Sequence, residues 1–243
     1  MSLVTACPFV RVVRGLWVAA SLWTATGSAL AAGAFERVRQ QEIAQCLPQE
    51  MATWGDGRDR PVPSLPSLWA YRHDGAPAWF DAPRVLAALQ RAAEAWGACG
   101  PTGAVERVDA GSRLPETAVV VQWSDSASRG NFGLAHLGER TLALGPTAFR
   151  LLEARNPAHP AGDTLQMVLS HEMGHFFGLM SHSRRCVDVM SYYSNAQGER
   201  CSTRNGHWPT GTTDYRALLP TACDIARCQA LNNEAVTART TGQ

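Results

Sequence analysis

The chain has 243 residues, of which 45% are hydrophobic, and its formal net charge is +1 at pH 7. A chain of this length and composition can bury one sizeable core, as an ordinary globular domain does. The charge shows no basic excess, which excludes the electrostatic footprint of a nucleic-acid-binding protein.

The first 31 residues are predicted to be a secretory signal peptide. Arg11 and Arg14 precede an apolar stretch over 15–25, and Ala29-Leu30-Ala31 then has the A-x-A form of a cleavage site. The alternative is a membrane anchor, for which this mildly apolar stretch is short. We therefore expect cleavage after this site, a secreted or periplasmic protein, and no membrane association once the signal peptide is removed.

Residues 32–66 are predicted to form an N-terminal arm, because they are polar and rich in Gly and Pro. A first strand is then expected over 68–72, followed by a helix from Pro83 to Trp96 that Asp81 can cap. The residues that recur at helical spacing and should form the buried stripe of this helix are Val85, Leu86, Leu89, Ala93 and Trp96.

Four further strands are predicted where short apolar runs alternate with Gly, Pro, Asn and Ser. They cover 104–108, 118–123, 133–137 and 141–144. Together with the first strand they should pair as one small, twisted, mixed sheet. Because long helices precede and follow these strands, the predicted fold class is α+β.

A second long helix is expected to begin at Asp163 and to end at His175. The reason is that Asp163-Thr164-Leu165-Gln166 has the form of a capping box, with Asp163 as the N-cap and Gln166 three residues later. A last helix should run from Thr221 to about Leu231. The folded domain is thus predicted over 67–233, with a C-terminal tail over 234–243.

Six cysteines remain after removal of the signal peptide, and they are Cys46, Cys99, Cys186, Cys201, Cys223 and Cys228. An even number in an exported protein indicates three disulfides. Cys186 and Cys201 are the most local candidate pair. If Cys223 and Cys228 share a helix, their Cα atoms lie roughly 8 Å apart, too far for one bridge. Each should therefore pair elsewhere, with Cys46 and Cys99 available and the pairing left open.

The most informative segment, 171–182, reads HExxHxxGxxxH. On a helix, His171 and His175 project from one face and can bind a single metal ion. Glu172 is rotated by about 100° from His171, which places it near the ion but not on it, where a general base should lie. Gly178 can adopt the left-handed conformation that ends a helix, so that the chain turns and His182 returns to the ion.

This pattern predicts a catalytic Zn²⁺ site. A zinc ion with three protein ligands keeps its fourth position for water and lowers the pKa of that water toward ~7. A neighbouring carboxylate such as Glu172 can then take the proton at neutral pH.

In motif and order of elements, the region 68–231 resembles the metzincin clan of zinc endopeptidases, in particular its matrixin-like and snapalysin-like branches. His171 to Gly178 matches the zinc helix and its terminating glycine. Val189-Met190-Ser191-Tyr192 looks like the Met-turn. The resemblance implies that Met190 lies beneath the metal and that Tyr192 contacts the zinc or the reacting carbonyl.

Three further segments carry the resemblance. Cys186 and Cys201 flank the Met-turn as a cysteine pair does in the snapalysin-like branch, and 223–231 resembles the DIxxxQAL helix that closes matrixin domains. Gly133-Leu134-Ala135-His136 is similar to the matrixin segment GxLAH, an edge strand along which a substrate peptide lies. We expect His136 itself to be a strand histidine without a metal. Cys46 faintly resembles the latch cysteine of matrixin pro-segments, but the even cysteine count favours a disulfide.

The chain departs from the metzincin pattern at the third metal ligand. That ligand falls six residues after the second histidine, where this chain has Ser181, and His182 follows one residue later. Because a hydroxyl is a poor zinc ligand beside an imidazole, we expect His182 to bind through a slightly longer turn. Asp188 and His207 are the other available ligands.

The function that the resemblance implies is an exported zinc endopeptidase acting on proteins or peptides. His171, His175 and His182 would hold the ion, Glu172 would act as general base and then general acid, and Tyr192 would hydrogen-bond the oxyanion. The alternative is an inactive, metzincin-like secreted binding protein that lost its third ligand. A downstream Glu199 ligand is disfavoured, because that glutamate lies in a Gly- and Asn-containing loop. We expect a monomer.

Overall fold

The computed structural model describes residues 24–206 and 215–241, with side chains over 34–206 and 215–232. The chain divides into two units, residues 1–37 and residues 38–243. Most of the predicted signal peptide lies outside the described residues. Helix α1 covers Thr24–Ala44, so the arm predicted over 32–66 is helical at its start. No helix in the described part of the chain is long and apolar enough to cross a membrane.

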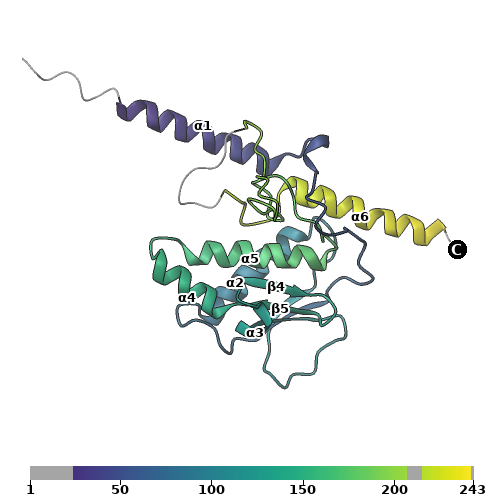
Figure 1. Cartoon of the computed structure of the whole chain (residues 1–243). Helices are drawn as coiled ribbons and strands as arrows, with labels where there is room; N and C mark the ends of the chain where they lie inside the picture. The colour runs from purple at the N-terminus through teal and green to yellow at the C-terminus, as the bar shows by residue number, and fades with distance from the viewer. Residues whose placement is uncertain (1–23, 207–214, 242–243) are drawn as a thin grey trace, which may run out of the picture. The chain divides into compact units, whose positions relative to one another are not determined.

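The second unit is a mixed α+β domain with a five-stranded mixed sheet, in agreement with the α+β class predicted for it (Figure 1). Its elements after α1 are η1 (Pro48–Glu50), β1 (Leu68–Tyr71), α2 (Ala82–Trp96), β2 (Ala104–Arg107), β3 (Val119–Trp123), α3 (Asp125–Ser128), β4 (Gly133–His136), β5 (Thr141–Leu144), α4 (Pro146–Arg155), α5 (Ala161–Phe176) and α6 (Ala222–Thr241). Every predicted strand is present, within one residue of its predicted ends.

The strands of the described chain form a single five-stranded sheet in the order β2-β1-β3-β5-β4. The pairs β1–β2, β1–β3 and β3–β5 are parallel, whereas β4 pairs with β5 antiparallel. Strand β4 is therefore an edge strand. Its register places Gly133 opposite Leu144 and His136 opposite Thr141.

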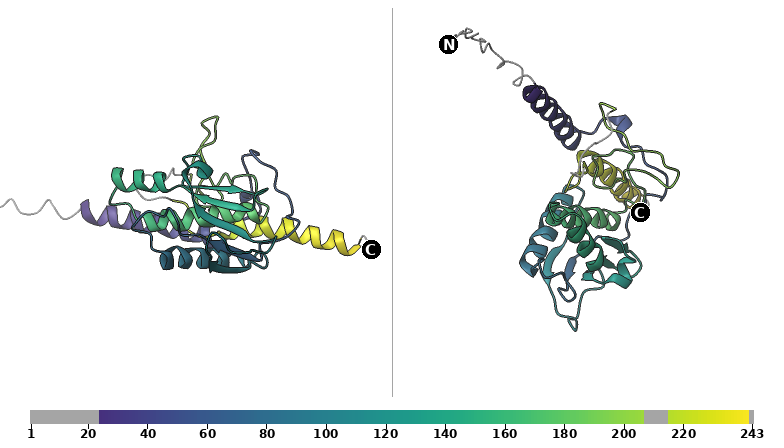
Figure 2. Two further views of the ribbon diagram at one scale, coloured as in Figure 1. Left: turned by 90° about the horizontal axis from the view of Figure 1, so that it is seen from below. Right: turned by 60° about the vertical axis from the view of Figure 1, so that its left-hand side comes forward.

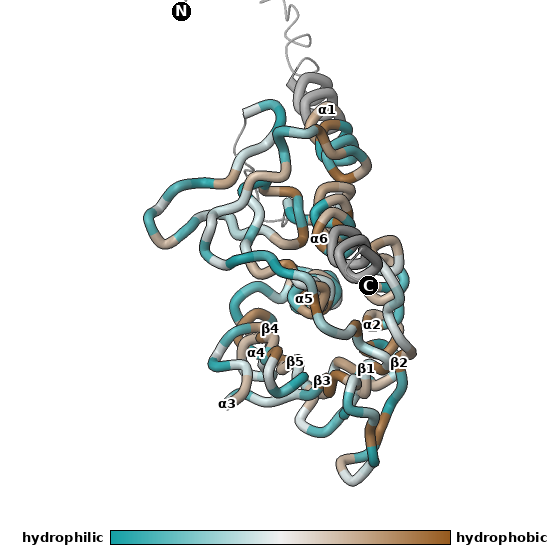
Figure 3. Tube along the Cα trace, turned by 90° about the vertical axis from the view of Figure 1, so that its right-hand side faces the viewer, coloured by the Kyte–Doolittle hydropathy of each residue, from teal (hydrophilic) through white to brown (hydrophobic). Residues whose placement is uncertain are grey.

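Helices α2 and α5 lie side by side over one face of this sheet (Figure 3). The same layers can be followed from two further sides in Figure 2. The indole nitrogen of Trp96 on α2 donates to the carbonyl oxygen of Ser170 on α5 at 2.9 Å, which ties the two helices together. Among the fully buried side chains between helices and sheet are Trp69, Val85, Leu89, Val121 and Leu169. The sheet and α2 thus form the rigid support on which α5 rests.

The predicted cap of α2 is confirmed, but that of α5 is wrong. Asp81 accepts a hydrogen bond from the backbone nitrogen of Arg84 at 2.7 Å. Helix α5 begins at Ala161, because the carbonyl of Pro160 already accepts the backbone N–H groups of Asp163 and Thr164. Asp163 therefore lies inside the first turn, where the positive end of the helix dipole stabilises its carboxylate. Gln166 donates its amide to the Ala88 carbonyl on α2 instead.

Besides α1 and η1, helices α3 and α4 were not predicted, and α6 is longer than predicted. Ser124 caps the single turn α3 by accepting from the backbone nitrogen of Ala127 at 3.2 Å. Helix α4 begins at Pro146 and buries Phe149. Helix α6 continues to Thr241, so most of the tail predicted over 234–243 is helical.

Three disulfides form within the described residues, and all three agree with the sequence-based expectation. They join Cys46 to Cys223, Cys99 to Cys228, and Cys186 to Cys201. Cys223 and Cys228 both lie on α6 and each pairs with a distant cysteine. Because Cys46 is bonded to Cys223, the latch interpretation of Cys46 is wrong.

The buried stripe of α2 gives a prediction for stability. Leu89 is fully buried, whereas Leu86 on the same helix is only partly buried. Leu89→Ala should lower the free energy of unfolding by about 2–5 kcal/mol, because it leaves a cavity in the core. Leu86→Ala should cost clearly less. Urea denaturation of both variants measures the difference, and equal losses would contradict the packing described above.

Candidate metal centre

Three histidines meet at the C-terminal half of α5. His171 and His175 lie on the helix, and His182 lies beyond the turn that follows it. One ring nitrogen from each of the three lies within 4.8 Å of the other two. The rings of His171 and His182 are stacked with centroids 5.1 Å apart. The structure therefore brings together the three histidines that the sequence singled out.

Gly178 makes the return of the chain possible. Its φ is +97°, in the left-handed region that favours glycine. A Cβ at this position would also lie 2.2 Å from the carbonyl oxygen of Arg60. Gly178 thus follows the end of the helix as expected, and the close approach of the N-terminal arm adds a second reason for glycine.

Each of the three imidazoles is held by a hydrogen bond at Nδ1. His171 Nδ1 lies 2.7 Å from the Val189 carbonyl oxygen, and His175 Nδ1 lies 2.7 Å from the Leu179 carbonyl oxygen. His182 Nδ1 lies 2.6 Å from Oδ2 of Asp56. Because these oxygens only accept, the proton of each ring is on Nδ1 and the lone pair is on Nε2.

The lone pair of His182 has no partner in the part of the chain that the structure describes. Its Nε2 is buried and makes no hydrogen bond to any described residue. Buried nitrogen atoms are normally satisfied, so an unpartnered one beside two further imidazoles fits a bound cation. Neutral imidazole nitrogens with hydrogen-bonded Nδ1 atoms are the ligand set that zinc commonly takes.

Burial keeps the three rings neutral. Burial and, to a smaller extent, the neighbouring His182 lower the pKa of His175 to about 4. The pKa of His171 falls well below its ordinary value for the same reason. Burial also lowers the pKa of His182, although Asp56 opposes that shift. At neutral pH the rings are therefore in the form that binds metals.

Glu172 lies next to this cluster and against the edge strand. Its side chain is buried. A Cβ on Gly133 would lie 2.8 Å from Cγ of Glu172, so only glycine allows β4 to pass so near. Burial raises the pKa of Glu172 to about 7. A carboxyl group with such a pKa can both accept and return a proton near neutrality.

Met190 packs on the helix that carries the first two histidines. Its side chain is fully buried, and a Cβ on Gly174 would lie 2.3 Å from its sulfur. The preceding Val189 is held from two sides, since its carbonyl accepts from His171 and its N–H donates to Asp224 of α6 at 2.9 Å. The loop around Met190 is thus fixed between α5 and α6.

The fallback ligands do not belong to the cluster. Asp188 is buried, and its carboxylate accepts from Ser183 at 2.6 Å and from Thr221 at 2.6 Å, outside the group of three histidines. Glu199 accepts from Asn195 at 2.6 Å in an exposed loop. His207 lies outside the described residues.

Ser181 faces the N-terminal arm. Its hydroxyl donates to Oδ1 of Asp56 at 3.2 Å and accepts from the backbone nitrogen of Gly55 at 3.1 Å. The ring that reaches the other two histidines is that of His182. The extra residue between Gly178 and the third histidine is thus taken up by a turn bonded to the arm.

Tyr192 covers the cluster from the solvent side. Its ring stacks on that of His182 with centroids 3.8 Å apart, and the residue is 42% exposed. His136 lies on β4, and its Nε2 lies 2.8 Å from the carbonyl oxygen of Ala127.

A cleft of about 440 Å³ runs between the histidines and the edge strand. It is lined by His171, Glu172, His175, His182, Tyr192 and Arg216, by residues 131–135 and Leu137, and by Met167, Val168 and Met180. The backbone nitrogen of Gly145 bonds the Phe132 carbonyl, so alternate residues of β4 face β5. Gly133 and Ala135 consequently direct their backbone groups away from β5.

Comparison with known proteins adds little. No family model and no curated protein matches the chain. Among solved structures the chain is similar to a chain of the GM1-bound form of the ECX AB5 holotoxin, with a TM-score of 0.42 and 14% identity. The match covers 77% of this chain and 91% of that one. A likeness at this level carries no argument about function.

Sequence reasoning missed the contribution of the N-terminal arm. Asp56 and Asp59 contact the turn that carries His182, yet they lie more than a hundred positions earlier, as the separation of 126 between Asp56 and His182 shows. The local sequence gives one signal only, which is two acidic residues close to glycines in a segment where no helix was predicted that they could cap. The segment is Trp54-Gly55-Asp56-Gly57-Arg58-Asp59.

The third position of the cluster can be tested by two single substitutions. Loss of a residue that hydrogen-bonds a metal ligand typically weakens metal binding by roughly 10–100-fold. His182→Ala removes a ligand itself and should weaken zinc binding by more than that. Ser181→Ala should stay within that range, because its hydroxyl contacts Asp56 and not the rings. Competition with a chelator measures both affinities. A stronger loss for Ser181→Ala would contradict the assignment of His182.

Proposed function

We propose that this protein is an exported, metzincin-like zinc endopeptidase. The observation that carries the proposal is the convergence of three neutral imidazoles beside a buried carboxylate and an open sheet edge. The three disulfides and the predicted signal peptide support export to an oxidising compartment.

His171, His175 and His182 would hold the ion through their Nε2 atoms. When bound there, zinc supplies a Lewis acid that polarises the scissile carbonyl and lowers the pKa of a water toward ~7. The hydrogen bonds at the three Nδ1 atoms fix the rings in the orientation that this requires.

Glu172 would transfer the proton. Its carboxylate accepts a proton from the attacking water and then delivers it to the amine nitrogen that leaves when the C–N bond breaks. The Glu172 pKa of about 7 in the buried site suits both directions of transfer.

The edge strand β4 would bind the substrate. A peptide added antiparallel to β4 can hydrogen-bond the outward backbone groups of Gly133 and Ala135, as in other cases of strand addition. This geometry favours an extended stretch of protein or peptide as the substrate. In this binding mode the scissile bond would lie between β4 and the histidines.

Tyr192 would stabilise the transition state. Its ring is already stacked on His182, and it lines the same cleft as Glu172. A phenol at this position can donate a hydrogen bond to the oxyanion that forms when water attacks the carbonyl.

The metzincin-like assignment draws on Met190 and α6 as well as the zinc motif. Met190 packs on Gly174, and Asp224 in the DIxxxQAL-like helix bonds the backbone just before Met190. The alternative of an inactive binding protein required the loss of the third ligand. The position of His182 argues against that alternative.

Replacing the proposed general base separates catalysis from metal binding. Glu172→Gln should lower the rate of casein or peptide cleavage by about 10²–10⁴-fold while the zinc content remains that of the wild type. Glu153→Gln, an exposed position on α4, serves as the matched control and should cleave normally. If the wild type and the Glu172→Gln variant both bind zinc and cleave equally and negligibly, the peptidase assignment is refuted.

Tyr192→Phe tests the hydroxyl without removing the ring. Because the stacking on His182 is kept, zinc affinity should not change. The value of kcat should fall by up to about 10²-fold, the lower range for loss of an oxyanion donor. Steady-state kinetics with one peptide measure it, and an unchanged kcat would exclude a catalytic role for Tyr192.

A further inference from the structure

We propose that Asp56, in the N-terminal arm, is a positioning residue for His182. The inference rests on the proposed function only in that the histidines bind a metal. It assigns to the arm a role other than that of a removable pro-segment.

Asp56 holds both the backbone and the ring of the same residue. Its Oδ1 accepts from the backbone nitrogen of His182 at 2.9 Å, and its Oδ2 lies 2.6 Å from Nδ1 of that ring. Oδ1 also accepts from the hydroxyl of Ser181 at 3.2 Å. One carboxylate thus fixes the rotation of the His182 ring and also binds the hydroxyl of Ser181.

The contact with the ring has a direct consequence for the metal. A carboxylate on Nδ1 fixes the tautomer that leaves Nε2 free and makes that nitrogen a stronger ligand. His171 and His175 have backbone carbonyls in this position. Only His182, which lies on a turn and not on α5, depends on a side chain supplied by another segment.

The arm is bonded to the whole turn and not to His182 alone. The backbone nitrogen of Trp54 donates to the His182 carbonyl at 2.9 Å, and that of Arg60 donates to the Gly178 carbonyl at 3.1 Å. Asp59 accepts from the backbone nitrogens of Met180 and Ser181, both at 2.8 Å. The arm and the turn therefore form one unit.

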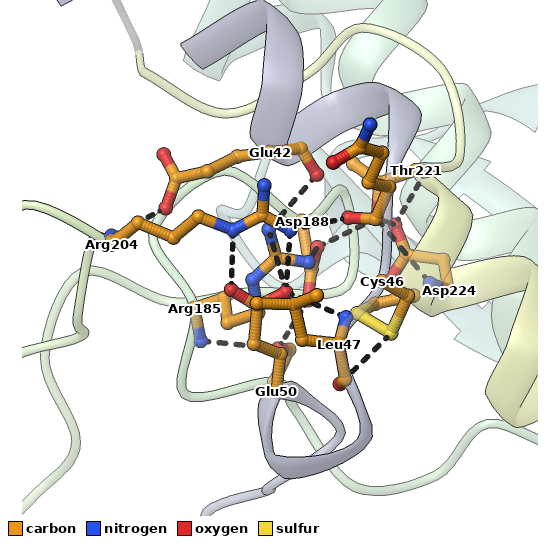
Figure 4. The surroundings of a disulfide bond; sticks show 12 residues. Glu42, Cys46, Leu47, Glu50, Arg185, Asp188, Arg204, Thr221 and Asp224 are labelled. Carbon is orange, nitrogen blue, oxygen red and sulfur yellow. Dashed lines mark hydrogen bonds and ion pairs between the residues drawn. A yellow bond between two sulfur atoms is a disulfide. The ribbon is translucent and has the colours of Figure 1, made fainter. Parts of the chain in front are cut away.

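A disulfide and partly buried ion pairs retain the arm (Figure 4). Cys46 is joined to Cys223 on α6. Glu50 pairs with Arg204, with its Oε1 2.6 Å from Nε. The buried Arg185 lies 3.7 Å from Glu50 and donates to the Glu42 carbonyl at 2.9 Å. Even a cleavage between the arm and the domain would leave the segment near Cys46 attached.

Asp59 offers a matched control, because it also holds the turn but does not contact a histidine ring. Both carboxylates accept backbone N–H groups of the turn, but Asp59 makes its remaining bond to Arg227, at 2.7 Å, and none to a histidine ring. If the arm merely stabilises the turn, the two aspartates should be equivalent. If Asp56 positions His182, only the replacement of Asp56 should change the zinc affinity and the Co²⁺ spectrum.

The test uses the full mature chain freed of metal and titrated with Zn²⁺ against a chelator, and with Co²⁺ for its absorption spectrum. Asp56→Asn keeps an acceptor for the His182 backbone but removes the negative charge that lies beside the His182 ring. Zinc affinity should therefore fall by about 10-fold. Asp56→Ala should lose up to about 100-fold and alter the Co²⁺ spectrum. Asp59→Asn should keep the wild-type affinity and spectrum.

Each outcome decides the inference. Equal zinc affinities for Asp56→Asn and Asp59→Asn, or a wild-type Co²⁺ spectrum in Asp56→Ala, would overturn it. So would the absence of metal binding by the wild-type chain. If the wild type binds zinc without cleaving peptides, the proposed function fails while the role of Asp56 is still measured. Urea unfolding of the metal-free variants shows whether a loss of fold explains a change in zinc affinity or in the Co²⁺ spectrum. If Asp56→Ala does not fold, Asp56→Asn still measures the contribution of Asp56 to zinc affinity.

Discussion

The candidate site depends on one arrangement of hydrogen bonds, in which His171, His175 and His182 are each bonded at Nδ1 and one ring nitrogen of each lies within 4.8 Å of the other two. Two of the acceptors are backbone carbonyls and the third is Asp56. Burial keeps the rings neutral. Three nitrogen lone pairs, none of them protonated, therefore lie close together in the cluster. Such an arrangement is costly unless a cation occupies it.

The rest of the domain places these hydrogen bonds. The packing of α5 on α2 and the sheet fixes His171 and His175, while α6 holds Val189 through Asp224. Strand β4 has to pass close to Glu172, which its glycine at position 133 allows. The N-terminal arm supplies what the helix cannot, since His182 lies on a turn and needs an acceptor from another segment. The contacts that hold these helices, β4 and the arm together therefore also fix the geometry of the site.

The local parts of this account could be predicted from the sequence. His171, Glu172, His175 and Gly178 are fixed by helical spacing and by the conformational freedom of glycine, and each strand is indicated by an apolar run between turn residues. The predicted start of α5 was wrong because Pro160 supplies the first carbonyl, which no side-chain pattern reveals. The contact between Asp56 and His182 joins residues 126 positions apart, and nothing in either local sequence specifies it. Pairings at that distance follow from the fold and not from a motif.

The central claim is that the three histidines bind one zinc ion, and X-ray absorption at the zinc edge of the purified mature chain tests it most directly. The account predicts one zinc per chain with three imidazole nitrogens at about 2.0–2.1 Å and one further light ligand. A chain without zinc, or a zinc ion with fewer than three imidazole neighbours, would contradict it.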